Sequence, residues 1–243
     1  MPNHFLKPIL IVSLLFTTLS FSQKQYEFDY LIEYDVTVNK ESKEIQNNSS
    51  SNSTQASKKY YFTNSKKNNY QAIVFDLDSL HYKMCFKDED GIMFNVNFLK
   101  SDLHKAEIMN IKCENVRRYL NPYKYQIKNY EYQILNDTLL DNKSYSHYTL
   151  GAINPKKAIS KKIGTEVFII DKETSFHVPI LEHSTAYEEW KANGTLPNGI
   201  FYEKLFIDYK GDLESKETLV GYWKIDKKIV FSEDCDYTTQ IEP

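Results

Sequence analysis

The amino-acid sequence predicts a mainly β or α+β protein, a curved antiparallel meander sheet of about nine strands with one or two short helices. Two observations carry this prediction. Tyrosine and phenylalanine, 19 and 14 of the 243 residues, dominate the apolar set, and aromatic side chains favour pleated strands. Apolar and polar residues also alternate in many short segments separated by polar turns, which is the pattern of half-buried strands.

The first 22 residues have the anatomy of a secretory signal peptide. Lys7 precedes an apolar run from Ile9 to Phe21, and small residues flank its end, so we expect cleavage after Ser22. The run is too short to cross a hydrocarbon core of ~30 Å comfortably, and an uncleaved anchor is the alternative. We therefore expect residues 23–243 to form a single β-rich domain with no transmembrane segment.

The first mature segment, Glu27 to Val38, alternates strictly and predicts a half-buried strand. Leu31 is the one exception to its pattern. One face carries the following apolar residues: Phe28, Tyr30, Ile32, Tyr34, Val36 and Val38. Residues 39–59 contain almost nothing to bury and predict a disordered loop. An interdomain linker would have the same composition, but one strand alone cannot form the domain before it.

A meander of three strands is predicted next, at residues 69–76, 80–86 and 92–98, because short polar turns join alternating segments. The first of the three is apolar on both faces. Ser101 can then cap a helix that continues to about Leu120. A strand from Ile108 to Cys113 is the alternative for this segment.

Alternation returns after Pro122. It predicts strands near residues 123–127, 130–134 and 145–150, the last two as a hairpin. Residues 152–164 suggest a basic, solvated connection, and a short strand follows.

A short helix is predicted from Thr185, because Glu188 completes a capping box with it. Gly194 lies where a left-handed residue would end this helix. The pair Asn198-Gly199 favours a turn, and alternation resumes at Ile200. Residues 218–231 supply one or two closing strands.

Composition excludes several classes of function. The formal net charge is −3, and it becomes −4 when residues 1–22 are removed with Lys7 and no acid. The bases include only two arginines, Arg117 and Arg118, so we expect no nucleic-acid partner. The glycines at 194 and 199 are followed by Ile200, without the lysine that a phosphate loop requires. No cofactor is therefore expected.

Histidines and cysteines give no clear metal site. His177 and His183 are six residues apart with Pro179 between them, which does not match a helical zinc motif. Three cysteines, Cys85, Cys113 and Cys235, allow three alternative disulfides, and buried unpaired thiols are an equal alternative. We expect no metal ligands.

Apolar residues on both faces of strands 69–76 and 200–209 suggest a second use for the sheet. A curved sheet has this pattern when helices cover one face and an apolar cavity lies on the other, whereas an ordinary two-layer core is the alternative. Trp190, Leu196 and Pro197 meet at the joint between the helix and the last strands. They are our candidate residues for the entrance of a ligand.

The late segment resembles the motif of the GLPGLI proteins, which are exported Gram-negative proteins with a signal peptide and an aromatic β meander. Leu196 and Pro197 match the motif, but Asn198 precedes Gly199 and Ile200. The resemblance extends from about Tyr26 to Phe231. It implies an envelope or secreted protein without catalytic residues to transfer.

Two functional hypotheses follow. The first is a non-catalytic exported protein, periplasmic, on the outer surface or secreted, that binds an apolar or lipid-like ligand or an envelope protein. The alternative is a periplasmic hydrolase that uses carboxylates or the region of His177 and His183.

Overall fold

The computed structural model describes residues 23–40, 53–119, 121 and 125–236. The predicted signal peptide and most of the predicted loop lie outside these residues. The strands are β1 (Gln23–Lys40), β2 (Ser53–Asn64), β3 (Lys67–Asp76), β4 (His81–Asp88), β5 (Ile92–Leu99), β6 (Ile108–Asn110), β7 (Val116–Arg118), β8 (Tyr130–Leu140), β9 (Lys143–Ala152), β10 (Thr165–Ile170), β11 (Phe201–Ile207) and β12 (Leu213–Ser232). The α helices are α2 (Asp102–Lys105), α3 (Pro155–Lys161) and α4 (Ser184–Asn193).

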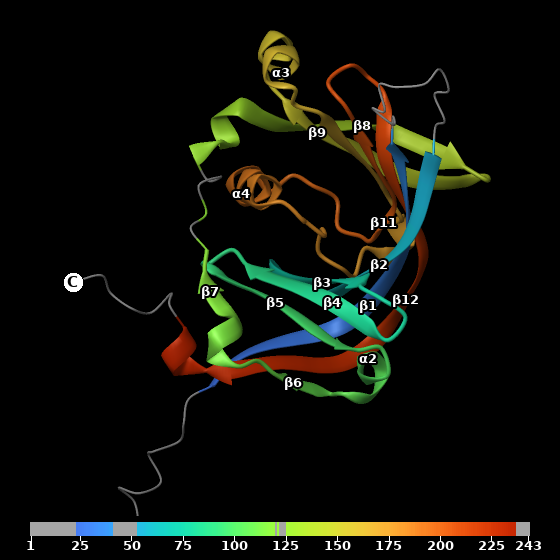
Figure 1. Ribbon diagram of the computed structural model, residues 1–243. Helices are drawn as coiled ribbons and strands as arrows, with labels where there is room; N and C mark the ends of the chain where they lie inside the picture. Colours follow the sequence, from blue (N-terminus) through green and yellow to red (C-terminus); the bar gives the residue numbers. More distant parts are fainter. Residues whose placement is uncertain (1–22, 41–52, 120, 122–124, 237–243) are drawn as a thin grey trace, which may run out of the picture.

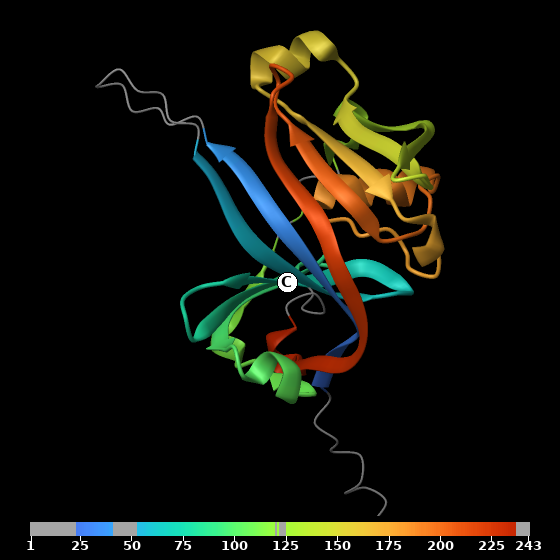
Figure 2. The same cartoon turned by 90° about the vertical axis from the view of Figure 1, so that its right-hand side faces the viewer.

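These twelve strands form one curved sheet, and eleven of them follow the order β7-β5-β4-β3-β2-β1-β12-β11-β10-β9-β8. Neighbours in this order are antiparallel, and β6 pairs with β12 in parallel. The predicted fold class is therefore confirmed. Figure 2 shows β1 and β12 side by side through both halves of the molecule. Within the described chain, none of the helices is long and apolar enough to span a membrane.

Two hydrophobic cores lie on opposite faces of the layer made by β2 and β3. The lower core in Figure 1 contains side chains of β1 to β5, α2 and the end of β12. The upper core lies against β9, β10, β11 and α4. In β3, Ala72 and Val74 face the lower core while Ile73 faces the upper one. The apolar residues predicted on both faces of this strand are thus explained by packing on both sides.

A register shift between β1 and β12 marks the point where the apolar residues of β1 divide between the two cores. The pairing of β1 with β12 shifts in register between Phe28 and Tyr30. Phe28 and Leu31 therefore pack in the lower core, and Tyr30, Ile32 and Tyr34 pack in the upper core. The prediction that these residues share one face with Phe28 is wrong, because the side chains of β1 change cores at this irregularity, where β12 carries one residue more than β1.

The predicted loop at 39–59 is too long. β1 continues to Lys40 and β2 begins at Ser53, so the two strands pair well beyond the cores.

The predicted helix from Ser101 to Leu120 is wrong as well. The helix α2 ends at Lys105. The alternative, a strand from Ile108 to Cys113, is closer to the structure, because β6 pairs with β12 and the backbone N–H of Ile111 donates to the Val230 carbonyl.

The second half of the chain differs from prediction in three local features. The basic connection contains α3, whose first turn is capped by the side chain of Asn154. Residues 127–129 form a 3-10 turn in place of a strand, and residues 122–124 lie outside the description. The capping box at Thr185 is not formed, because α4 begins at Ser184 with His183 as its N-cap. Residues 218–231 belong to one strand, β12.

Gly194 ends α4 as the sequence predicts, with φ of 61° and ψ of 20°. No atom lies within 4 Å of the Cβ that a substitution would add, so only the backbone conformation opposes one. We expect Gly194→Ala to lower the free energy of unfolding by about 1 kcal/mol, because a residue with a Cβ is strained at positive φ. Gly194→Asn should cost less, since asparagine tolerates this conformation. Equal urea midpoints for alanine, asparagine and wild type would contradict this explanation of the helix end.

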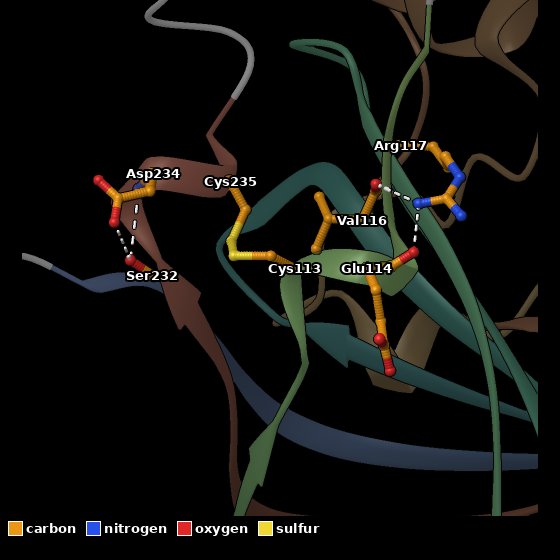
Figure 3. Close-up of a disulfide and its surroundings, with 7 residues drawn as sticks. All are labelled: Cys113, Glu114, Val116, Arg117, Ser232, Asp234 and Cys235. Carbon is orange, nitrogen blue, oxygen red and sulfur yellow. Dashed lines mark hydrogen bonds between the residues drawn. A yellow bond between two sulfur atoms is a disulfide. The ribbon is translucent and has the colours of Figure 1, made fainter.

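One disulfide joins the chain between β6 and β7 to the residues that follow β12. Cys113 and Cys235 are 122 residues apart in the sequence and form the bond shown in Figure 3. Beside it, the Arg117 guanidinium donates to the backbone carbonyls of Glu114 and Val116. This is one of the three pairings that the sequence allows, and Cys85 is the free thiol.

Candidate functional site

A cavity of about 390 Å³ lies between the concave face of the upper strands and the start of α4. Figure 1 shows α4 between the β8–β11 part of the sheet and the β3–β5 part. One wall is mainly apolar, and it consists of Tyr130, Leu150, Ile163, Gly164 and Phe206. The other wall is mainly polar, and it consists of Lys87, Tyr119, His183, Ser184 and Thr185. Glu166 lies on the mainly apolar wall, between its register partners Leu150 and Phe206.

Three neighbouring strands, β9, β10 and β11, form the wall of the cavity on the side of the sheet. Leu150 on β9, Glu166 on β10 and Phe206 on β11 are register partners, so their side chains leave the same face of the sheet. Gly164 lets β10 approach β11 closely, since an added Cβ would lie 2.5 Å from the Ile207 carbonyl oxygen. The curved wall of the cavity is therefore built from regular strands.

A buried cluster of ionic side chains lies behind the cavity. The Lys204 ammonium is 2.6 Å from Glu182 and 2.8 Å from Glu217. The Lys59 ammonium is 2.8 Å from Glu182 and 3.0 Å from Glu217. Tyr61 donates its hydroxyl hydrogen to the same two carboxylates, at 3.0 and 2.8 Å. Every charge in the cluster has an opposite charge beside it.

Burial and charge act against each other on these groups. Burial opposes the charge of Lys204, but Glu182, Glu217 and Glu166 outweigh it and raise the pKa of this ammonium. Burial alone would raise the pKa of Glu182, whereas Lys204 and Lys59 hold it well below its usual range. Both groups therefore stay ionised at neutral pH.

Glu166 and His183 form the ion pair of the cavity itself. Glu166 is 9 % exposed, and its carboxylate lies 3.3 Å from Nε2 of His183. The hydrogen bond to Glu166 raises the pKa of the His183 imidazole, against a smaller opposing effect of burial. The histidine ring is exposed, so it can leave the carboxylate with little loss of packing.

The polar wall is tied together around Ser184. The Lys87 ammonium donates to the Ser184 hydroxyl at 2.8 Å and lies 3.0 Å from Glu89. The Tyr119 hydroxyl is also 2.9 Å from the Ser184 hydroxyl. A hydrolase of the serine type needs its nucleophile bonded to the base. Here Ser184 is buried and its hydrogen-bond partners are Lys87 and Tyr119, whereas His183 contacts Glu166.

The histidines named from the sequence do not share a site. His177 is buried, with Nε2 at 2.8 Å from the Thr63 hydroxyl and Nδ1 at 2.6 Å from the Val178 carbonyl. Burial lowers its pKa. Among the described residues, no group of three histidine, cysteine or acidic side chains could hold a metal ion.

The three candidate entrance residues lie elsewhere in the upper half. Leu196 is buried in the upper core, and Trp190 packs against that core from α4. Neither they nor Pro197 belong to the lining of the cavity given above. Their role at an entrance stays a prediction.

The sequence matches no protein-family model and no curated protein. Among solved structures, the Pseudomonas aeruginosa MucA/MucB complex is similar at 6 % identity and a TM-score of 0.37, over 80 % of this chain and 52 % of that one. An uncharacterized conserved protein from Thermus thermophilus has 9 % identity and a TM-score of 0.36, over 90 % and 88 % of the two chains.

A putative outer membrane lipoprotein-sorting protein domain from Vibrio parahaemolyticus has 8 % identity and a TM-score of 0.32, over 81 % and 85 % of the two chains. The present chain spans about half the length of the MucB structures that it matches. At these scores, the similarities assign neither a family nor an activity. The resemblance to GLPGLI proteins likewise stays a prediction.

Proposed function

We propose that this protein is an exported, non-catalytic binding protein that holds an amphipathic, lipid-like molecule in the cavity beside α4. The observation that carries the proposal is the division of that cavity into an apolar wall and a polar wall. An amphipathic ligand can bury its chain against Leu150, Ile163 and Phe206 while its head faces the polar side chains. The predicted signal peptide supports export.

The size of the cavity restricts the ligand. Its volume of about 390 Å³ lies near the lower end of the range, roughly 300–1,000 Å³, in which small molecules bind to proteins. A molecule with one aliphatic chain suits this space better than a lipid with two.

Filling the cavity should abolish binding. The probe is monodecanoylglycerol, an uncharged single-chain amphiphile, used below its micellar concentration in isothermal titration calorimetry. Ile163→Trp places a large ring in the cavity, so we expect about tenfold weaker binding or worse, which equals a loss of about 1.4 kcal/mol.

The matched control is Ile159→Trp, which adds the same ring to the exposed face of α3 outside the cavity lining. It should bind the probe as the wild type does. Native mass spectrometry of the purified wild type should in addition show a retained single-chain amphiphile. Equal affinities of the two tryptophan variants, or no binding by the wild type, would refute the proposal.

A further inference from the structure

Glu166 stands out among the residues that line the cavity, because it is a buried carboxylate whose ion pair within the described chain is with an exposed histidine and not with a lysine. Only 9 % of the residue is exposed. Within the described chain its one ion pair is with His183, at 3.3 Å, and that imidazole ring is 63 % exposed. A buried carboxylate in this position is costly unless a cation lies beside it.

When His183 is left aside, the charges around the cavity add up to an excess of one negative charge. Apart from His183, the charged side chains that line the cavity or form ion pairs next to it are at most 24 % exposed. They comprise three lysines, Lys59, Lys87 and Lys204, and four glutamates, Glu89, Glu166, Glu182 and Glu217. Every lysine of the set has a carboxylate within 3.0 Å, so the unmatched charge falls on Glu166.

Aromatic rings line the same cavity as Glu166. Tyr119, Tyr130 and Phe206 all contribute to its surface. The face of such a ring attracts a cation, and this attraction grows when water is excluded. A carboxylate among aromatic rings is a favourable environment for an ammonium group, since both interactions act on one charge.

We propose that the ligand of this cavity carries an ammonium nitrogen, and that this nitrogen pairs with Glu166 in the place that the His183 imidazole takes here. This inference rests on the proposed function, and it adds the class of the head group. An acidic amphiphile would instead bring a second negative charge beside Glu166.

Three probes with the same aliphatic chain separate head group from chain. They are decyltrimethylammonium, decanoate and the uncharged monodecanoylglycerol, each below its micellar concentration. By isothermal titration calorimetry we expect the cation to bind the wild type about tenfold more tightly than the neutral probe, and decanoate to bind more weakly than both.

Glu166→Gln keeps the shape of the side chain and removes its charge. We expect this variant still to bind the neutral probe but to lose the preference for the cation over it. Glu214→Gln, which removes an exposed glutamate of β12, is the matched control and should keep the preference. Retained binding of the neutral probe shows that each variant is folded.

His183→Ala gives a second readout that leaves Glu166 intact. The imidazole faces Glu166 on β10, Lys204 on β11, Lys87 on β4 and the neighbouring Glu182. Because protonated His183 competes with the ligand for Glu166, wild-type affinity for the cation should rise as the pH increases through the raised pKa of this histidine. The alanine variant should bind the cation more tightly and lose this pH dependence.

The outcomes distinguish the two proposals. If the wild type binds none of the three probes, the proposed function fails and this inference fails with it. If the wild type binds the neutral probe but shows no preference for the cation, only the inference is overturned. A preference that survives in Glu166→Gln also overturns it, since the carboxylate would then not be the group that recognises the head.

Discussion

Replacing Lys204 by methionine is expected to lower the free energy of unfolding by about 3–5 kcal/mol. Lys204 is 8 % exposed and its ammonium lies between Glu182 and Glu217. Without it, Lys59 alone neutralises two buried carboxylates, and removal of one partner from a buried ionic cluster leaves an uncompensated charge. Equilibrium unfolding in urea measures the change.

Lys216→Met is the matched control for this prediction. Lys216 pairs with Glu203 at the surface, with its side chain 34 % exposed, and loss of such a pair costs about 1 kcal/mol or less. The double variant Lys204→Met/Glu217→Leu should lose less stability than the sum of its single substitutions, because it removes both charges of one pair. Equal unfolding of the two methionine variants would contradict the role given to the buried cluster.

Removing the disulfide is expected to cost about 2–4 kcal/mol under oxidising conditions. The bond between Cys113 and Cys235 closes a large loop, since the two residues are 122 positions apart. In the chain-entropy account, such a crosslink stabilises the fold by restricting the unfolded chain. We expect Cys113→Ala/Cys235→Ala to unfold at lower urea concentration than the wild type.

The free cysteine supplies the control for the disulfide variant. Cys85→Ala removes a half-buried thiol that is not bonded to sulfur, so it should be less destabilising. Dithiothreitol should lower the stability of the wild type and of Cys85→Ala but leave the double alanine variant unchanged. A wild type that unfolds identically with and without this reductant would show that the bond contributes nothing.

Local patterns account for most of the strands that are predicted correctly. In β3 to β5 and in the hairpin of β8 and β9, apolar and polar residues alternate along the chain, and this alternation indicates which side chains face a core. Such a pattern depends only on residues that are close in the sequence. β6 and β7 are three residues long and exist because β12 and β5 offer a partner. The pattern of residues 108–113 predicts β6 only as an alternative to a helix, and no local pattern predicts β7.

The site is harder to predict than the strands. Lys59 stands at the end of a polar segment that predicts a loop. Its partners Glu182 and Glu217 are 123 and 158 residues away, so no local pattern indicates that its charge is paired. A usable signal is present in β10, where Glu166 takes an inward position on the same face as Phe168 and Ile170. A charged residue at an inward position of a strand indicates either a buried partner or a ligand.

The pairing of the first described strand with the last one also sets the order of folding. Gln23 pairs with Ser232, and the register continues to Val38 and Ser215. The centre of the sheet therefore stays incomplete until almost the whole described chain has been synthesised, and contacts of such long sequence separation form slowly. The structure therefore closes only when its last described strand pairs with its first.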